Sequence, residues 1–196
     1  MRHDDPKHLF ENICKKVFRD VEDEPKLQAL TGEKLNKYKS ANKDQNARSD
    51  VRVRSFWTSQ QNAFFDFKVV YPFASSYLDK NPAALYEACA QDKVRQYEER
   101  INRVEASSFT PMIMSSTGGM GPQMSLAIKH IARCTAEKRK EAYSQTITVI
   151  RCRFTFALLR AALVCLRGSR SPTPRFFNTH DVLNTPVDLV AQETRL

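Results

Sequence analysis

The sequence predicts an α/β fold in which a small mixed β-sheet lies between helices. Apolar residues recur at helical spacing near the N-terminus, strand-like runs follow around residues 50–71 and 109–114, and further helical segments separate and follow them. An order of helix, strands, helix, strand, helix, helix is typical of an α/β arrangement. With 196 residues, of which 41% are hydrophobic, the chain is long enough for one well-buried core.

The first element is an amphipathic helix over roughly residues 7–20. Its apolar positions fall on one face of a helix with 3.6 residues per turn, and they are Leu9, Phe10, Ile13, Cys14, Val17 and Phe18. Pro25 ends this region, and residues 26–30 are expected to form a short strand before the turn at Thr31-Gly32. Residues 33–48 are polar and rich in Lys and Asn, which indicates a loop.

Two strands are predicted next, over residues 50–57 and 63–71, with a polar turn between them. Successive side chains of a strand point to opposite faces, so Asp66 and Lys68 share one face while Phe65 and Phe67 share the other. A carboxylate and an ammonium group in an apolar strand are costly to bury unless they are paired or bind a metal. This pair of strands is therefore where chemistry is expected.

A helix starting at Asn81-Pro82 is predicted next, because Asn is a favoured cap and Pro suits the first helical position. It is expected to run to about Glu105 and to bury Ala83, Ala90, Val94, Tyr97, Ile101 and Val104. A strand at residues 109–114, a glycine-containing loop at 117–122 and a helix at about 123–140 follow. A last, largely buried helix is expected over about residues 146–166.

The domain predicted from these elements spans residues 1–168, and the Ser- and Pro-rich residues 169–196 are expected to form a loosely held tail. The most apolar run, residues 154–166, is short and contains Arg160, so no membrane span is expected. Five scattered cysteines indicate reduced thiols rather than a disulfide framework or a zinc site. Without a secretory signal, a nuclear or cytoplasmic location is expected, and not secretion.

The charge balance points to an anionic partner. Lys and Arg total 31 against 22 for Asp and Glu, which gives a formal net charge of +9 and a sequence pI near 9.4. Such an excess favours nucleic acid as the partner, although a generically basic protein has the same composition. Arg153, Arg160 and Arg167 recur at seven-residue spacing, so they either line a phosphate-binding groove or form the polar stripe of a helix.

The acidic residues of the strand pair match the needs of a phosphodiester hydrolase. Such an enzyme uses carboxylates to hold a hard divalent cation, Mg²⁺ or Mn²⁺, and a cationic group near the attacking water or the developing charge. Asp50, Asp66 and Lys68 supply these groups. The register between the strands decides whether Asp50 lies opposite Asp66, and the sequence leaves that register open.

Asp50, followed by 15 residues and then Asp66-Phe67-Lys68, resembles the signature of PD-(D/E)xK nucleases, the restriction-endonuclease-like superfamily. The resemblance implies a restriction-endonuclease-like core in which a helix precedes a sheet hairpin that carries the acids and the lysine. The chain also resembles, over most of its length, the endonuclease-like C-terminal region of animal retroelement proteins that follows a reverse-transcriptase domain. The segments that carry this second resemblance are Glu24-Pro25-Lys26-Leu27-Gln28, Ser40-Ala41-Asn42, Ala47-Arg48-Ser49-Asp50, Phe64-Phe65-Asp66-Phe67-Lys68-Val69, Phe109-Thr110-Pro111, Gly118-Gly119-Met120 and Arg167-Gly168-Ser169-Arg170.

Carried over residue by residue, the resemblance makes Asp50 and Asp66 metal ligands and gives Lys68 the role of orienting or activating the water. Ser49 stands where the signature has Pro. The third acid, which the family takes from its first helix, stays open here. The candidates for this third acid are Asp5, Glu11 and Glu33.

Related nucleases often carry Gln-x-x-x-Tyr on the helix after the hairpin, where it contacts DNA. In this chain Lys93 replaces the Gln and Tyr97 keeps the Tyr, so the resemblance assigns nucleic-acid contacts to Lys93, Gln96, Tyr97 and Arg100. The other interpretation is a solvated helix face with Tyr97 in the core.

Three functions are carried forward from the sequence. The first is a metal-dependent DNA endonuclease of retroelement origin, with Mg²⁺ or Mn²⁺ as the cofactor. The second is a catalytically inactive nucleic-acid-binding module on the same fold. The third is a basic protein-interaction domain.

Overall fold

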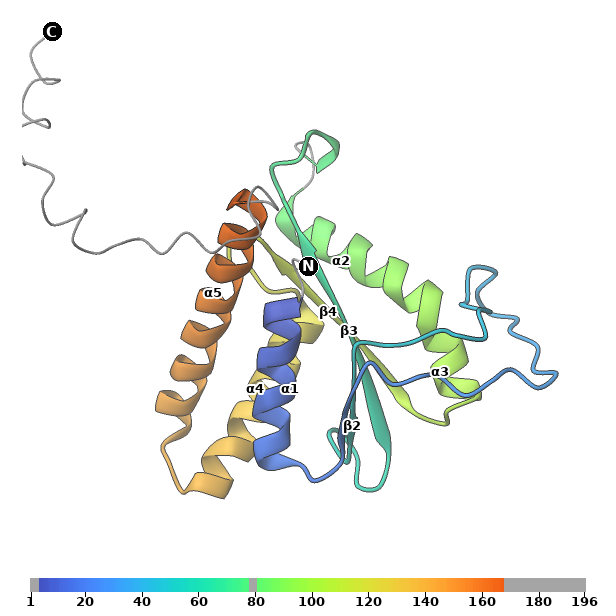
Figure 1. Ribbon diagram of the computed structural model, residues 1–196, viewed down its shortest axis with the longest axis horizontal. Helices are drawn as coiled ribbons and strands as arrows, with labels where there is room; N and C mark the ends of the chain where they lie inside the picture. Colours follow the sequence, from blue (N-terminus) through green and yellow to red (C-terminus); the bar gives the residue numbers. More distant parts are fainter. Residues whose placement is uncertain (1–3, 78–80, 168–196) are drawn as a thin grey trace, which may run out of the picture. The chain divides into compact units, whose positions relative to one another are not determined.

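A computed structural model describes residues 4–77 and 81–167. The compact unit it defines spans Met1–Leu166, and the expected C-terminal tail, residues 169–196, lies outside the described residues. The fold is α/β: a four-stranded mixed sheet with helices packed against it (Figure 1). The fold class predicted from the sequence is confirmed.

The sheet has the strand order β1-β2-β3-β4. Strands β1 and β2 pair antiparallel, β2 and β3 pair antiparallel, and β3 and β4 pair parallel. The parallel pair is joined by a helical crossover, as parallel strands require. The strands are β1 (Val21–Asp23), β2 (Val51–Arg54), β3 (Asn62–Val70) and β4 (Ser108–Ser115).

Helices cover both faces of the sheet (Figure 1). One face buries the largest apolar cluster, which includes Phe10 of α1 and Phe154 of α5, and the ring of Phe10 packs against that of Phe65 on β3. The other face is covered by the helical segment after β3. The helical elements are α1 (Asp4–Val17), α2 (Pro82–Lys93), the π-helical turn η2 (Val94–Glu98), α3 (Glu99–Arg103), α4 (Pro122–Arg139) and α5 (Tyr143–Arg167), with a short 3-10 turn at Ser75–Tyr77.

The start of α2 follows the predicted capping chemistry. The Asn81 side chain accepts a hydrogen bond from the backbone N–H of Ala83 at 2.9 Å, and Pro82 occupies the first helical position. Ala83 itself is exposed, whereas the sequence predicted it to be buried. A cap that satisfies an orphan N–H at the helix start contributes about 1 kcal/mol.

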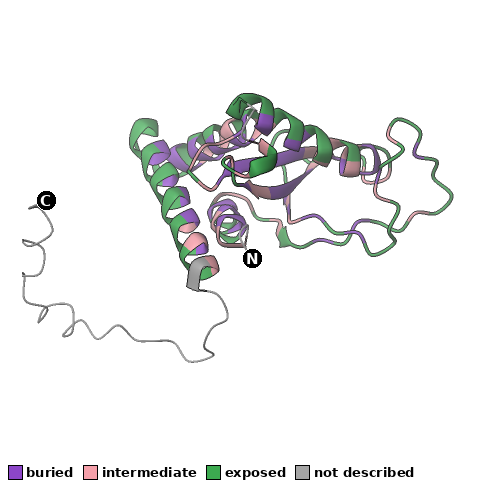
Figure 2. Ribbon diagram, turned by 90° about the horizontal axis from the view of Figure 1, so that it is seen from above, coloured by how far each residue is buried: buried purple, intermediate pink, exposed green. Residues whose placement is uncertain are grey.

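Two further sequence expectations about the fold are wrong. The first strand is Val21–Asp23 rather than residues 26–30, where the structure has only an isolated bridge between Lys26 and Arg48. The last helix is not largely buried, because apolar side chains such as Phe156 face solvent. Figure 2 shows that α5 is buried along one side and exposed along the other. This helix has two apolar faces, and the spacing of its apolar residues does not tell which of the two is packed against the domain.

Among the described residues, no helix is both long and apolar enough to cross a membrane.

Candidate functional site

Asp50 lies where β2 separates from β3. Pairing between these strands begins at Val51 opposite Phe65, and the backbone N–H of Asp50 donates to the Phe65 carbonyl at 3.1 Å. One step further along β3, the Asp50 carboxylate accepts the N–H of Phe67 through Oδ2 at 2.6 Å. The side chain thus replaces the backbone acceptor that a longer β2 would have offered, and this bond fixes the carboxylate beside residue 66.

Asp66 lies on the face of β3 that is covered by α2, and its side chain is only 6% exposed. Its Oδ2 atom is 2.6 Å from the Nζ atom of Lys93, the last residue of α2. The ion pair explains how a carboxylate is accommodated in an apolar strand, because burying it without a partner would cost several kcal/mol. Lys93 therefore joins the site that the sequence assigned to the two strands.

Both carboxylates contribute to the electrostatics of Lys93 and Tyr97, Asp66 more strongly than Asp50. Burial lowers the pKa of Lys93, but the charge of Asp66 and its hydrogen bond, with smaller contributions from Tyr97 and then Asp50, outweigh burial, so that pKa is raised. Burial, followed by the Asp66 charge, raises the pKa of Tyr97. Lys93 Nζ also lies 5.6 Å from the centre of the Tyr97 ring, a favourable cation–π distance.

Lys68 occupies the next position on the same face of β3 and is half-buried. Strand geometry puts its Cα about 7 Å from that of Asp66. Apolar clusters flank the two charged positions: one contains Phe64 and Tyr97, and the other contains Val70. Asp66 and Lys68 therefore lie between two apolar patches. Apolar surroundings lower the local dielectric constant and so strengthen the interactions between charges.

The π-helical turn η2 begins directly after Lys93. Such a turn is rare, and it occurs frequently at functional sites. Here it lies between Lys93, which is turned toward Asp66, and the buried residues Glu99 and Arg100.

The three candidates for a third acid lie in different parts of the fold. Glu11 forms an ion pair with Lys15 at 2.5 Å, on a helix that covers the face opposite to Asp66. Asp5 lines a groove between α1 and α5. Glu33 is exposed and accepts hydrogen bonds from the N–H and hydroxyl groups of Thr31 in its own loop. A hydrogen bond from its own backbone N–H, followed by the bonds from Thr31, lowers its pKa.

Among the described residues, a second acidic cluster consists of His8, Glu11 and Asp23, whose potential ligand atoms lie within 4.8 Å of one another. Two of the three are exposed, and lysines already neutralise its acids: Lys7 contacts Asp23 at 2.9 Å, and Lys15 contacts Glu11. Exposed acidic groups of this kind are common without an ion. This cluster therefore carries no assignment.

Arg100, assigned by resemblance to nucleic-acid contact, is fully buried. Its guanidinium donates to the backbone carbonyls of Asn42 at 3.2 Å, Asp44 at 2.5 Å and Gln28 at 2.8 Å. It therefore holds the long loop between β1 and β2 against the helix, and it is not available to a nucleic acid in this conformation. That expectation is corrected, because an arginine that satisfies buried carbonyls is already committed to the fold.

The other residues of that helix face are placed as follows. Tyr97 is buried within an apolar cluster, as the core interpretation predicted. Gln96 is half-buried, and its backbone carbonyl accepts the N–H of Asn42 at 2.5 Å. Lys93 faces Asp66, so its ammonium group belongs to the acidic site.

Glu99 is a residue that the sequence did not single out. Its carboxylate accepts the N–H groups of Asn36, Lys37 at 2.6 Å and Tyr38 at 2.6 Å, so it caps the same loop that Arg100 holds. Although Glu99 is almost fully buried, which by itself would raise its pKa, these three hydrogen bonds lower that pKa. The partners are about sixty residues away in sequence, and no local pattern signals them.

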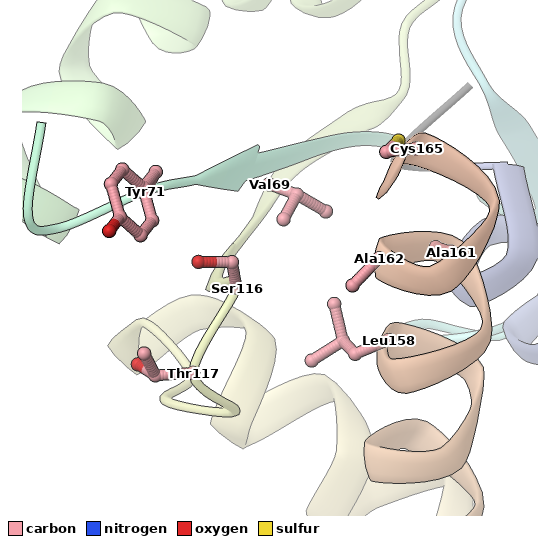
Figure 3. A pocket seen from close by; sticks show the side chains of 8 residues that line it. All are labelled: Val69, Tyr71, Ser116, Thr117, Leu158, Ala161, Ala162 and Cys165. Carbon is pink, nitrogen blue, oxygen red and sulfur yellow. The ribbon is translucent and has the colours of Figure 1, made fainter. Parts of the chain in front are cut away.

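A cavity of about 420 Å³ lies on the opposite face of the sheet, between the end of β3 and α5 (Figure 3). Its walls are mostly apolar, and they include Val69 and Leu158. Because Val69 points away from the face that carries Asp66, this cavity is separate from the acidic site.

Comparison with known proteins provides no relative for this chain: no protein-family model matches it, and a search of curated proteins finds no match.

Proposed function

We propose that this chain is a divalent-metal-dependent nuclease that hydrolyses DNA phosphodiester bonds at Asp50, Asp66 and Lys68. The observation that carries the proposal is the arrangement of charged side chains at the fork of β2 and β3, the point beside Asp50 where the two strands separate. There, the Asp50 carboxylate is held by the N–H of Phe67, the Asp66 carboxylate pairs with the half-buried Lys93, and Lys68 shares the face of β3 that carries Asp66. The resemblance to PD-(D/E)xK nucleases implies a helix before a sheet hairpin, followed by a helix and another strand, and α1, the β2–β3 hairpin, α2 and β4 follow one another in that order.

The chemistry of the two carboxylates fits a hard cation. Mg²⁺ and Mn²⁺ prefer oxygen ligands, and Mg²⁺ is commonly held by one or two carboxylates plus waters. Asp50 accepts the Phe67 N–H through Oδ2. This hydrogen bond orients the carboxylate, and the other oxygen, Oδ1, can serve as a ligand. A bound ion would act as a Lewis acid and stabilise the charge that develops on the phosphoryl oxygens.

The residues of the chain have distinct roles in this proposal. Asp50 and Asp66 hold the cation, and Lys68 orients the attacking water or neutralises the developing charge. Lys93 neutralises the charge of Asp66 and orients its carboxylate, because the Lys93 ammonium is 2.6 Å from Oδ2. The net charge of +9 favours approach of the polyanionic substrate. A retroelement origin rests on the sequence resemblance alone.

The experiment is a plasmid-nicking assay with Mg²⁺ or Mn²⁺. Asp50→Asn is the most informative variant, because the asparagine amide oxygen can still accept the Phe67 N–H while the charge needed for the cation is lost. We expect Asp50→Asn and Lys68→Ala to lose at least a hundredfold in nicking rate while DNA binding at low salt persists. Asp92→Asn changes an exposed acid one residue from Lys93 and is expected to nick like the wild type. Wild-type nicking by the Asp50 and Lys68 variants would contradict the proposal.

One observation favours a second candidate, a nucleic-acid-binding module without catalysis. The Lys93 ammonium is already within 2.6 Å of Asp66, so the carboxylate has a protein cation even without a metal. This candidate predicts binding that weakens steeply with salt, and no cleavage with either metal. Failure to bind any nucleic acid at low salt would instead favour the protein-interaction domain.

A further inference from the structure

The outer side of α5 carries a regular apolar stripe. Five exposed residues follow one another at alternating spacings of three and four positions. In chain order they are Val149, which is 57% exposed, Cys152, Phe156 at 70%, Leu159 at 53% and Leu163 at 53%. In a heptad written abcdefg, these five residues are at a, d, a, d and a.

The same helix packs into the domain through a different face. The apolar residues that it buries are Ile147, Ile150, Phe154, Leu158 and Ala161, which occupy positions b, c and f of the same heptads. The a and d stripe therefore lies opposite the packed face, on the exposed side of α5 in Figure 2. Packing within the domain does not account for its apolar residues.

We infer that the a/d stripe of α5 is a homodimer interface in which two copies of the chain pair their α5 helices in parallel. Among the large apolar residues that α5 exposes, Tyr143 and Val164 fall at b positions, and the other four keep to a and d. A pattern that keeps mainly to a and d is the narrow seam of a two-helix coiled coil, whereas a helix lying on a lipid surface presents a wider apolar face. Thr148 and Thr155 border the stripe on one side, and Arg153 and Arg160 border it on the other. Polar borders on both sides confine the contact to one partner helix.

The charges beside the stripe select the second copy and its direction. The arginines occupy e positions and the threonines occupy g positions, and in a parallel pair each e residue lies beside a g residue of the other helix. Arg153 then meets the second copy's Thr148, and Arg160 meets its Thr155, so no like charges oppose each other. An antiparallel pair would put Arg153 beside the second copy's Arg160, which costs free energy.

The size of the stripe is sufficient for a specific, reversible dimer. Apolar side chains that are each more than half exposed offer on the order of 400–500 Å² per copy, taking aromatic and aliphatic areas together. Two copies with their flanking residues would bury on the order of 1,000 Å², which is the lower limit for a biological interface. We therefore expect a dimer at micromolar concentration rather than an obligate one.

Sedimentation equilibrium of the full chain over a wide concentration range tests the interface. We expect the wild type to dimerise and Leu159→Glu to dimerise at least tenfold more weakly. Leu126→Glu is the matched control, because Leu126 is a comparably exposed leucine on α4, at 59%, and it should leave dimerisation unchanged. Circular dichroism of both variants checks that the fold is retained.

Cys152 reports the direction of the helices. In a parallel pair, equivalent d residues face each other, so copper-catalysed air oxidation should link two copies through Cys152, and Cys152→Ser should abolish the link. An antiparallel pair centred on Phe156 separates the two Cys152 residues by about 12 Å along the helix, beyond the reach of a disulfide.

Three results would overturn the inference. The wild type could stay monomeric at every concentration, or Leu159→Glu could dimerise as well as the wild type. The wild type could also remain monomeric and sediment with vesicles of anionic phospholipid, in which case a lipid surface covers the stripe. The test does not involve the acidic site, so its outcome is independent of the proposed nuclease function.

Discussion

Replacing Lys93 by Met should destabilise the fold by removing the partner of a buried carboxylate. The Lys93 and Asp66 side chains are 21% and 6% exposed, and the charged atoms lie 2.6 Å apart. At an effective dielectric constant of about 20, Coulomb attraction at roughly 3 Å is about 5 kcal/mol, and desolvation offsets part of it. Breaking fully buried pairs costs about 3–5 kcal/mol, so for this partly exposed lysine we expect a loss of about 2–3 kcal/mol.

A double-mutant cycle measures the pair itself. Urea unfolding of the wild type, Lys93→Met, Asp66→Asn and the double variant, followed by circular dichroism, gives the coupling energy. We expect about 2 kcal/mol. The matched control is the exposed pair Arg95–Asp92 on the same helical segment, 3.7 Å apart, where less than about 0.5 kcal/mol is expected. If the two pairs gave the same small coupling, the reasoning about the buried pair would be refuted.

The pH dependence of this pair has a definite sign. The pKa of Lys93 is raised in the folded state. Its stabilising contribution is therefore fully present below the unfolded lysine pKa, about 10.4, and it is lost as the pH rises through the folded pKa. The difference in unfolding free energy between the wild type and Lys93→Met should thus be constant near neutral pH and shrink only in strongly alkaline solution.

Three other predictions concern the loop and the helix start. Arg100→Met should loosen the loop between β1 and β2 and speed its cleavage in limited proteolysis, since three carbonyls lose a buried charged donor; unchanged cleavage would contradict this role. The lowered pKa of Glu99 means that its stabilisation is present above the unfolded pKa, about 4.3, and is lost as the pH falls through the folded pKa. The difference in Tm between the wild type and Glu99→Gln should therefore fall in acid, and a constant difference would argue against the assignment. Asn81→Ala should lower the unfolding free energy by about 1 kcal/mol in urea titrations, and no change would show that the cap is not stabilising.

The sequence predicted the parts of the structure that depend on local periodicity. Alternation in β3 correctly placed Asp66 and Lys68 on one face, opposite Phe65 and Phe67. The Asn81-Pro82 pair correctly marked the start of α2, because a cap and an N1 proline act within a few residues.

The remaining features depend on contacts that no local pattern contains. The Lys93–Asp66 ion pair joins a helix to a strand, and Arg100 reaches the carbonyl of Gln28 across 72 positions. The position of β1 was missed for a similar reason: three residues with one apolar side chain form a strand only because β2 supplies a partner. The exposed side of α5 was misjudged because apolar composition does not say which face is packed.

The central claim is that Asp50 and Asp66 form one cation site at the fork of β2 and β3. Isothermal titration of Mn²⁺ into the wild type, Asp50→Asn and Asp92→Asn tests it most directly, because the measurement does not depend on DNA. We predict one binding site in the wild type and in Asp92→Asn, and at least tenfold weaker binding in Asp50→Asn. Equal Mn²⁺ binding by the wild type and Asp50→Asn, or no binding by either, would contradict the claim.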